Sequence, residues 1–212
     1  MDVPVAVNHD HAMGSTVDFV ERASRAGLVI GVAGLVALVT IGLFFAIGQP
    51  WGTVNDLALI VMTAAIPVLM LAFWQLGGLT PTPLALTAQA AGWLAVAVWC
   101  VTHVLFVAGA VSIDYESPAA GAWAIEAVAL VVIGLWIAGA NLLAGPWLSA
   151  IRWFGVVTGI GVVIFAIGTL LSGSQGALVY IGGLAYLVLL PAWGFVMSRY
   201  LRRLDQTPVP AA

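Results

Sequence analysis

Charged residues are scarce in this sequence. Asp, Glu, Lys and Arg make up 7% of its 212 residues, whereas 63% are hydrophobic. Because a soluble domain carries roughly 25% charged residues, this chain has too few polar side chains to cover a surface that faces water. Lipid is therefore the expected solvent for most of it. Lysine is absent, all six basic residues are Arg, and Ala, Val and Gly are abundant, a composition typical of a GC-rich bacterial genome.

Cysteine occurs once, at Cys100, so no disulfide bond can form within the chain. A secretory signal peptide is also lacking. Residues 1–25 are mostly polar, and the first apolar run is too long for a signal-peptide core and has no small-residue cleavage site after it. That run is expected to remain in the protein as its first membrane span. His9 and His11, in the polar segment before it, are expected to be solvated or disordered.

The marks of known membrane enzymes are missing as well. An intramembrane serine protease needs a Ser and a His in different spans, and an aspartyl protease needs two Asp residues inside the bilayer; neither pattern is found. No glycine-rich phosphate loop, nucleotide motif or basic nucleic-acid surface is found either. Enzymatic activity is therefore the least favoured class, and neither a cofactor nor a nucleic-acid partner is expected.

Long apolar runs dominate what is present. A bilayer core needs about 20 residues in helical form, and six stretches qualify. They run from Ala26 to Gly48, Leu57 to Leu79, Leu86 to Val111, Gly121 to Leu143, Trp153 to Leu171 and Gly176 to Met197. They are far longer than barrel strands and show no sustained apolar–polar alternation. The connections between them are short and contain Pro and Gly, so consecutive helices are expected to pair as antiparallel hairpins.

The predicted fold is thus an all-α polytopic transmembrane bundle of six helices, arranged as three hairpins. Residues 26–200 form the transmembrane domain, and residues 1–25 and 201–212 form cytoplasmic tails. Lys and Arg are retained on the cytoplasmic side during insertion. With six spans, every arginine falls on one side of the membrane: Arg22, Arg25, Arg152, Arg199, Arg202 and Arg203. Both termini are therefore predicted to be cytoplasmic, in a multi-pass protein of the cell membrane.

Two ionisable side chains lie well inside the predicted spans. His103 is about seven residues from the outer end of the third span, and Glu126 is about five residues from the outer end of the fourth. At about 1.5 Å per residue both lie roughly 8–10 Å below the outer surface, and pairing lowers the cost of burying either charge in lipid. A polar intramembrane site at His103 and Glu126 is one hypothesis, and a structural hydrogen bond between helices is the alternative. Cys100 shares a helix face with His103, but nothing completes a metal-binding cluster, so no metal is predicted.

The loop between the first two spans ends on a polar pair, Asn55 and Asp56. Either residue can cap the second helix, because a side-chain oxygen at a helix start accepts hydrogen bonds from the free N–H groups there. The alternative for Asp56 is that it lines an acidic mouth on the outer side, together with Asp114 and Glu116.

Small residues recur at a spacing of four in two of the spans. Gly27 with Gly31, and Gly155 with Gly159, form the pattern that lets two helix backbones approach closely. The pattern predicts helix packing within a tight bundle. It does not specify a dimer, because such pairs are common in apolar helices.

Two functional classes remain open. The scarcity of polar groups inside the spans favours a non-catalytic membrane component or accessory subunit, whose partners are lipid, other membrane subunits or further copies of the chain. The matched depth of His103 and Glu126 favours a small-solute or proton-linked transporter or sensor. A water-filled cavity that reaches these two residues would support the second class, whereas a closed, dry bundle with an exposed apolar groove would support the first.

Overall fold

The computed structural model describes residues 9–76, 81–111, 121–143, 151–172 and 176–205, and all regular structure in these ranges is helical. The α-helices are α1 (His9–Ile47), α2 (Trp51–Leu76), α3 (Pro83–Val107), α4 (Gly121–Leu143), α5 (Arg152–Ser172), α6 (Ala177–Leu184) and α7 (Leu190–Asp205). A π-helix, η3 (Ala185–Leu189), joins α6 to α7 without a break.

Six of these helical segments are long and apolar enough to cross a membrane, with α6, η3 and α7 together forming the sixth. The all-α class and the count of six spans are therefore confirmed, and the chain is a multi-pass membrane protein by the length and composition of its helices. The bounds of α4 agree with the predicted span at both ends, whereas α2 begins at Trp51 and not at Leu57.

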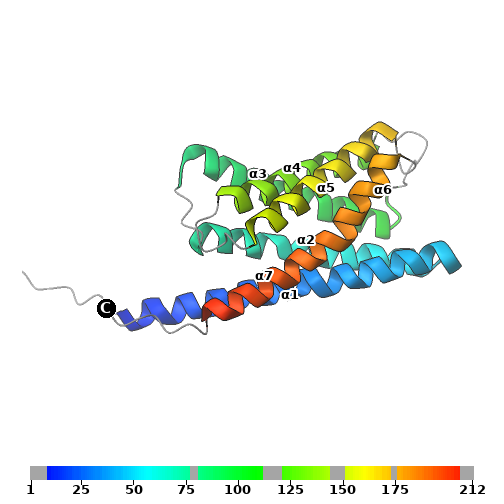
Figure 1. Cartoon of the computed structure of the whole chain (residues 1–212). Helices are drawn as coiled ribbons and strands as arrows, with labels where there is room; N and C mark the ends of the chain where they lie inside the picture. Colours follow the sequence, from blue (N-terminus) through cyan, green and yellow to red (C-terminus); the bar gives the residue numbers. More distant parts are fainter. Residues whose placement is uncertain (1–8, 77–80, 112–120, 144–150, 173–175, 206–212) are drawn as a thin grey trace, which may run out of the picture.

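The first helix begins at His9, well before its predicted start at Ala26. His9 and His11 are thus part of a helix. Of the two expectations for them, disorder is wrong, and solvation stays a prediction. Residues 18–25, whose side chains the structure describes, are amphipathic: Val20 and Ala23 lie on a buried face, and α1 packs along α7 (Figure 1). A search for uniformly apolar runs misses such a segment, because only one side of it contacts protein.

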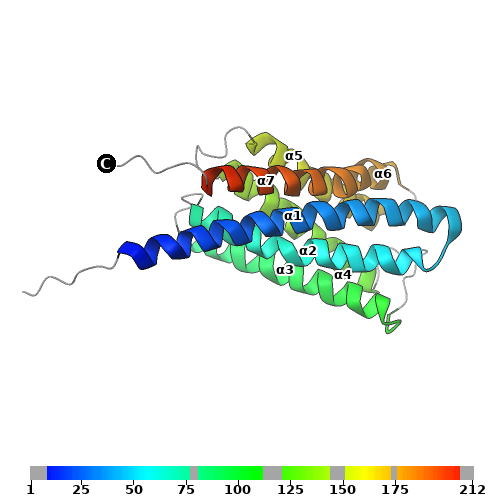
Figure 2. The same cartoon turned by 90° about the horizontal axis from the view of Figure 1, so that it is seen from below.

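The helices α1 and α7 lie side by side, and α1 begins at the end of the bundle where α7 ends (Figures 1 and 2). At this end the Ser24 hydroxyl donates to the Ser198 carbonyl at 3.1 Å and accepts from Arg202 Nε at 3.1 Å. Next, α2 packs on α1 and α3, α4 packs on α3 and α5, and α5 packs on α6. Consecutive helices are therefore neighbours. Which side of the membrane each end of the bundle faces stays a prediction.

Two glycines of α1 lie where α7 approaches most closely. A Cβ atom on Gly27 would lie 2.8 Å from the carbonyl oxygen of Gly194, and a Cβ atom on Gly31 would lie 2.7 Å from the ring of Phe195. Real Cβ atoms do not come so close to other heavy atoms. The backbones of α1 and α7 can therefore approach closely at Gly27 only because this position carries no side chain, and the missing side chain of Gly31 leaves room for the Phe195 ring.

The other predicted glycine pair lies between α5 and α4. A Cβ atom on Gly159 would lie 2.5 Å from the carbonyl oxygen of Gly134, and a Cβ atom on Gly155 would lie 2.0 Å from Oδ1 of Asn141. The contact at Gly159 is with backbone, which cannot turn away as a side chain can. Gly159 is therefore expected to tolerate a side chain less well than Gly155.

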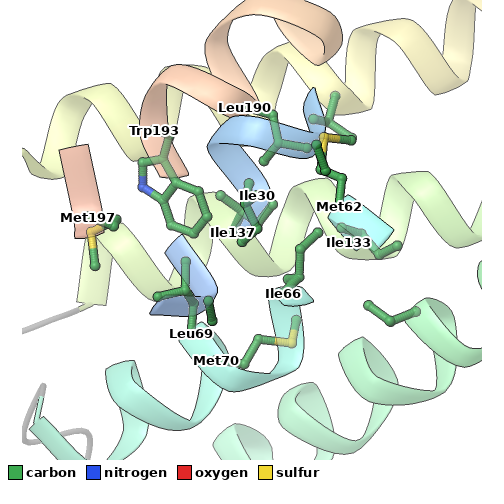
Figure 3. Packing of buried hydrophobic residues seen from close by; sticks show 14 of the residues in the cluster. Ile30, Met62, Ile66, Leu69, Met70, Ile133, Ile137, Leu190, Trp193 and Met197 are labelled. Atoms are coloured by element: carbon green, nitrogen blue, oxygen red, sulfur yellow. The ribbon is translucent and has the colours of Figure 1, made fainter. Parts of the chain in front are cut away.

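Apolar side chains from α1, α2, α4 and α7 fill the interior of the bundle (Figure 3). Each of the following residues is at most 1% exposed: Ile30, Met62, Ile66, Leu69, Met70, Ile133, Ile137, Leu190, Trp193 and Met197. Inside lipid, dispersion contacts of this kind hold helices together, since burial there removes no water.

The predicted orientation can be measured with reporter fusions. A reporter that is active only outside the cytoplasm should be inactive when it follows Ala212 and active when it is inserted beside Glu116. The reason is that the arginines keep both termini and the loop between α4 and α5 in the cytoplasm. The expected result is opposite activities at the two positions. Equal activities at both would contradict the predicted topology.

Candidate functional site

Three ionisable side chains from three helices meet near the end of the bundle that the orientation prediction places outside, called the outer end below. Oε1 of Glu126 on α4 directly contacts Nδ1 of His103 on α3, and Oδ1 of Asp56 on α2 lies 3.8 Å from Nε2 of the same ring. The exposed fraction of the side chain rises from 5% for Glu126 to 10% for His103 and 36% for Asp56. The imidazole thus lies between a buried carboxyl group and one that reaches the surface.

His103 and Glu126 face one another because each lies on the buried face of its helix. The buried residues of α3 recur every three or four positions: Gly92, Ala95, Val96, Trp99, Thr102 and His103. On α4 the buried face passes through Glu126, Leu130, Ile133, Ile137 and Asn141. Residues at this spacing share one side of an α-helix. The rise per residue predicts a common depth for the pair, and the buried faces add a common direction; a functional role for the pair stays a prediction.

Asp56 reaches His103 from the second turn of α2. The expectation that Asn55 or Asp56 caps this helix is wrong, because α2 begins at Trp51 and its first turn has no acidic residue. Asn55 is buried instead, and its Nδ2 donates to the Ala37 carbonyl of α1 at 2.7 Å. This bond fixes the start of α2 against α1 and leaves the next residue, Asp56, near α3.

Two aromatic rings of α3 hold the imidazole in place. Trp99 stacks on His103 with 3.9 Å between ring centroids and 20° between planes. Phe106 meets the same ring edge-on, at 5.9 Å and 71°. They lie one turn before and one turn after His103, as spacings of four and three residues require. The face of an indole ring attracts cations, so Trp99 is suited to contact a protonated imidazole.

The remaining predicted groups do not join this cluster. Cys100 is partly buried on α3, and within the described ranges no group of three His, Cys, Asp or Glu side chains could hold a metal ion. Asp114 and Glu116, which were predicted to line an acidic mouth with Asp56, lie outside the described residues.

Comparison with known proteins adds no assignment. No protein family, curated protein or solved structure matches the chain. The six apolar helices indicate a multi-pass membrane protein, and any finer function has to be inferred from the cluster of Asp56, His103 and Glu126.

Two shallow hollows lie on the outside of α1 and α2, with volumes of about 270 and 350 Å³. Only apolar side chains line them, among them Val32, Ala33, Val36 and Val61. No member of the Asp56, His103 and Glu126 cluster contributes to either. Such surfaces suit lipid chains, because a site for a polar solute needs polar groups that converge on it.

Sequence reasoning missed two buried hydroxyl groups deeper in the bundle. Thr63 on α2 and Tyr186 on η3 are 1% and 4% exposed. The available signal was a proline in the same membrane span as each residue: Pro67 for Thr63 and Pro191 for Tyr186. A proline interrupts the backbone hydrogen bonds of its helix, and membrane helices meet that loss with side-chain hydroxyls, waters or a π-helical turn.

Proposed function

We propose that this protein is a non-catalytic membrane component that responds to protons at the site formed by Asp56, His103 and Glu126. One observation carries the proposal: the His103 ring lies between two carboxyl groups that belong to other helices. Histidine is the side chain that changes charge near physiological pH. A proton on this ring therefore alters the attraction among α2, α3 and α4.

The proton has a defined place to bind. Nδ1 of the ring lies against Oε1 of Glu126, and Nε2 faces Oδ1 of Asp56. A proton from the outer solution, passed on by the partly exposed Asp56, binds at Nε2 and turns the ring into a cation between two carboxylates. Both ion pairs then draw α2 and α4 toward α3, and Trp99 offers its face to the cation. When the ring loses the proton, both ion pairs are lost and the attractions weaken.

Two further titratable groups lie near the site. Cys100 is on α3, one turn before His103, and the buried Tyr186 is on η3. Thiols and phenols in general keep their protons at neutral pH. The charge at the site is thus expected to be set by Asp56, His103 and Glu126.

The packing below the site favours a sensor over a transporter. Met62, Ile66, Ile133 and Ile137 fill the centre of the bundle and are at most 1% exposed (Figure 3). Among the described residues no charged side chain lies in this layer, so an ion would have to cross it without a counter-charge, which costs several kcal/mol (roughly 3 or more for one charge). A proton that enters at Asp56 therefore leaves by the same route, and the protonation state is expressed as a change in helix packing.

The proposal predicts that His103 titrates in lipid and that the bundle responds. Replacing His9 and His11 with Gln leaves one histidine, so isotope-labelled histidine in bilayer discs reports this ring alone. We expect the ring to take up a proton as the pH falls and the fluorescence of the stacked Trp99 to change in step with it. The His103→Gln variant should lose that fluorescence change.

The matched control is Thr87→Val, an exposed position on the same helix, which should keep the full transition. A ring that holds one protonation state at every pH at which the protein is folded would overturn the proposal. So would a ring that titrates while the NMR signals of residues in α2 and α4 stay constant, because the site would then be structural.

A further inference from the structure

One arginine is held in place at the end of the bundle opposite to His103, where α1 begins and α7 ends (Figures 1 and 2). The Arg202 guanidinium donates from Nε to the Ser24 hydroxyl at 3.1 Å and from Nη2 to the Ser198 hydroxyl at 3.3 Å. The Ser24 hydroxyl in turn donates to the Ser198 carbonyl at 3.1 Å. Both serines are 2% exposed, whereas Arg202 is exposed. Two buried hydroxyls from two helices thus fix one charged group at the surface.

The close approach of α1 and α7 brings the two serines together. Gly27 is one turn after Ser24, and a Cβ atom on Gly27 would lie 2.8 Å from the Gly194 carbonyl oxygen and 2.9 Å from the Ser198 nitrogen. At this helix spacing one guanidinium reaches hydroxyls on both helices. Because a guanidinium is planar and rigid, two bonds to fixed partners also set the direction of its remaining N–H groups.

The guanidinium keeps donors for a further partner. It has five N–H groups, and the bonds to Ser24 and Ser198 use one on Nε and one on Nη2. Among the side chains that the structure describes, no carboxylate pairs with Arg202, and Glu21 pairs with Arg25. An arginine held in this way is suited to an oxyanion, since a phosphate group accepts two parallel bonds from the guanidinium fork.

The lengths of two spans place Arg202 among lipid headgroups. The first and the sixth span have 30 and 27 residues, or about 45 and 40 Å as helices, whereas the hydrocarbon core of a bilayer is about 30 Å thick. Exposed apolar side chains continue to the other end of both spans, as Ile47 and Leu178 show. The surplus length is therefore at the arginine end, where Arg202 lies in the last turn of the sixth span.

Positive charge dominates this end of the bundle. Residues 18–25 and 198–205 contain five arginines and three acidic residues: Arg22, Arg25, Arg199, Arg202, Arg203, Asp18, Glu21 and Asp205. Basic segments next to a membrane span attract anionic lipids. A zwitterionic lipid gains less, because its own cation offsets its phosphate. The surplus of arginine therefore favours an anionic headgroup.

We propose that Arg202, held by Ser24 and Ser198, binds the phosphate group of one anionic phospholipid at this end of the bundle. A lipid fits better than a phosphate ion from solution, because the surface next to the site is apolar. Leu28 is one turn beyond Ser24 along α1 and lines a hollow of about 350 Å³ between α1 and α2. An acyl chain can lie on such a surface, whereas a free phosphate ion would gain nothing from it.

The direct test is solid-state NMR of the full chain in bilayer discs, with arginine labelled with ¹⁵N. In discs that contain phosphatidylglycerol we expect dipolar coupling between lipid ³¹P and the side-chain nitrogens of Arg202, assigned through the backbone signals of α7. Discs of phosphatidylcholine alone should give a weaker coupling. Both leaflets of a disc have the same composition, so the result does not depend on which end of the bundle is cytoplasmic.

The affinity for phosphatidylglycerol, measured by native mass spectrometry of the full chain, separates a built site from general attraction. Arg202→Lys keeps the charge but loses the fork that bonds to both serines and to phosphate, so the affinity should fall about tenfold or more. Arg199→Lys is the matched control, since Arg199 is exposed on the same helix, and should leave the affinity unchanged. Ser24→Ala keeps every charge and should also weaken binding. Equal unfolding midpoints will show that the variants fold.

Three results would overturn the proposal. Equal coupling in both kinds of disc would show that the site does not select anionic lipid. Equal affinities for Arg202→Lys and Arg199→Lys would show that the arginines act only as a diffuse positive surface. Inorganic phosphate that binds in phosphatidylcholine discs as tightly as phosphatidylglycerol would show that the ligand is a soluble anion. The site shares no residue with the His103 cluster, so a failure of the proton response would leave it standing.

Discussion

Replacing Gly159 with Leu is expected to destabilise the bundle strongly. A single Cβ atom at this position would lie 2.5 Å from both the Gly134 carbonyl oxygen and the Ala138 nitrogen of α4. Overpacking of a core costs about 1–3 kcal/mol when neighbours can move, and here the neighbours are backbone atoms of a packed helix. A leucine must therefore push α5 away from α4 along its length, with a loss of more than about 3 kcal/mol.

The measurement is equilibrium unfolding in mixed detergent micelles, with Gly139→Leu as the control. Gly139 is on α4, and a Cβ atom added there meets no heavy atom within 4 Å. Leu favours helix over Gly by about 0.8 kcal/mol in a helix interior, so the control should be as stable as the wild type or slightly more so. Equal midpoints for Gly159→Leu and the wild type would show that the close approach of α4 and α5 does not exist.

The number of spans could be predicted because a bilayer allows few alternatives. An apolar run of the right length must satisfy its backbone hydrogen bonds internally, so it becomes a helix. Gly121–Leu143 shows this best, since the predicted and the observed bounds agree. The first turns of α1 could not be found in this way, because their burial depends on α7, which is more than 150 residues away along the chain, as the contact of Ser24 with Ser198 illustrates.

The candidate site could be predicted in part. Helix rise alone places His103 and Glu126 at one depth, and the structure brings their side chains into contact. Asp56 was assigned to a helix cap because the start of α2 was placed too late along the chain. Once α2 begins at Trp51, the same residue falls in the second turn, where it can reach His103.

Tyr186 shows where periodicity fails in this protein. The π-helix of residues 185–189 has more residues per turn than an α-helix, so the side of the helix on which Tyr186 lies does not follow from a spacing of 3.6. Pro191 marks the place of the irregularity, and the packing against α5 decides its form. A polar residue four or five positions before a proline inside a membrane span, as Thr63 is before Pro67 and Tyr186 before Pro191, is therefore a signal that can be sought in a sequence.

The strongest prediction about the site is that a second mutation restores stability. Replacing His103 with Leu leaves the Glu126 carboxylate, with a side chain that is 5% exposed, without its ion-pair partner. A buried charge that loses its partner costs about 3–5 kcal/mol. Replacing Glu126 with Leu in that background removes the stranded group, and we expect the double variant to recover about 2 kcal/mol or more of the loss.

The single Glu126→Leu variant should be less damaging than His103→Leu, because the neutral ring can then carry its proton on Nε2, which faces Oδ1 of Asp56 at 3.8 Å in the wild type. Gln89→Leu serves as the control, since it removes a bond of 3.1 Å from Trp136 between the same two helices, far from His103. Its cost, about 1 kcal/mol, should simply add to that of His103→Leu. If Glu126→Leu also adds its full cost to His103→Leu, then the two side chains act independently, and the ion pair on which the proton response depends does not form in the membrane.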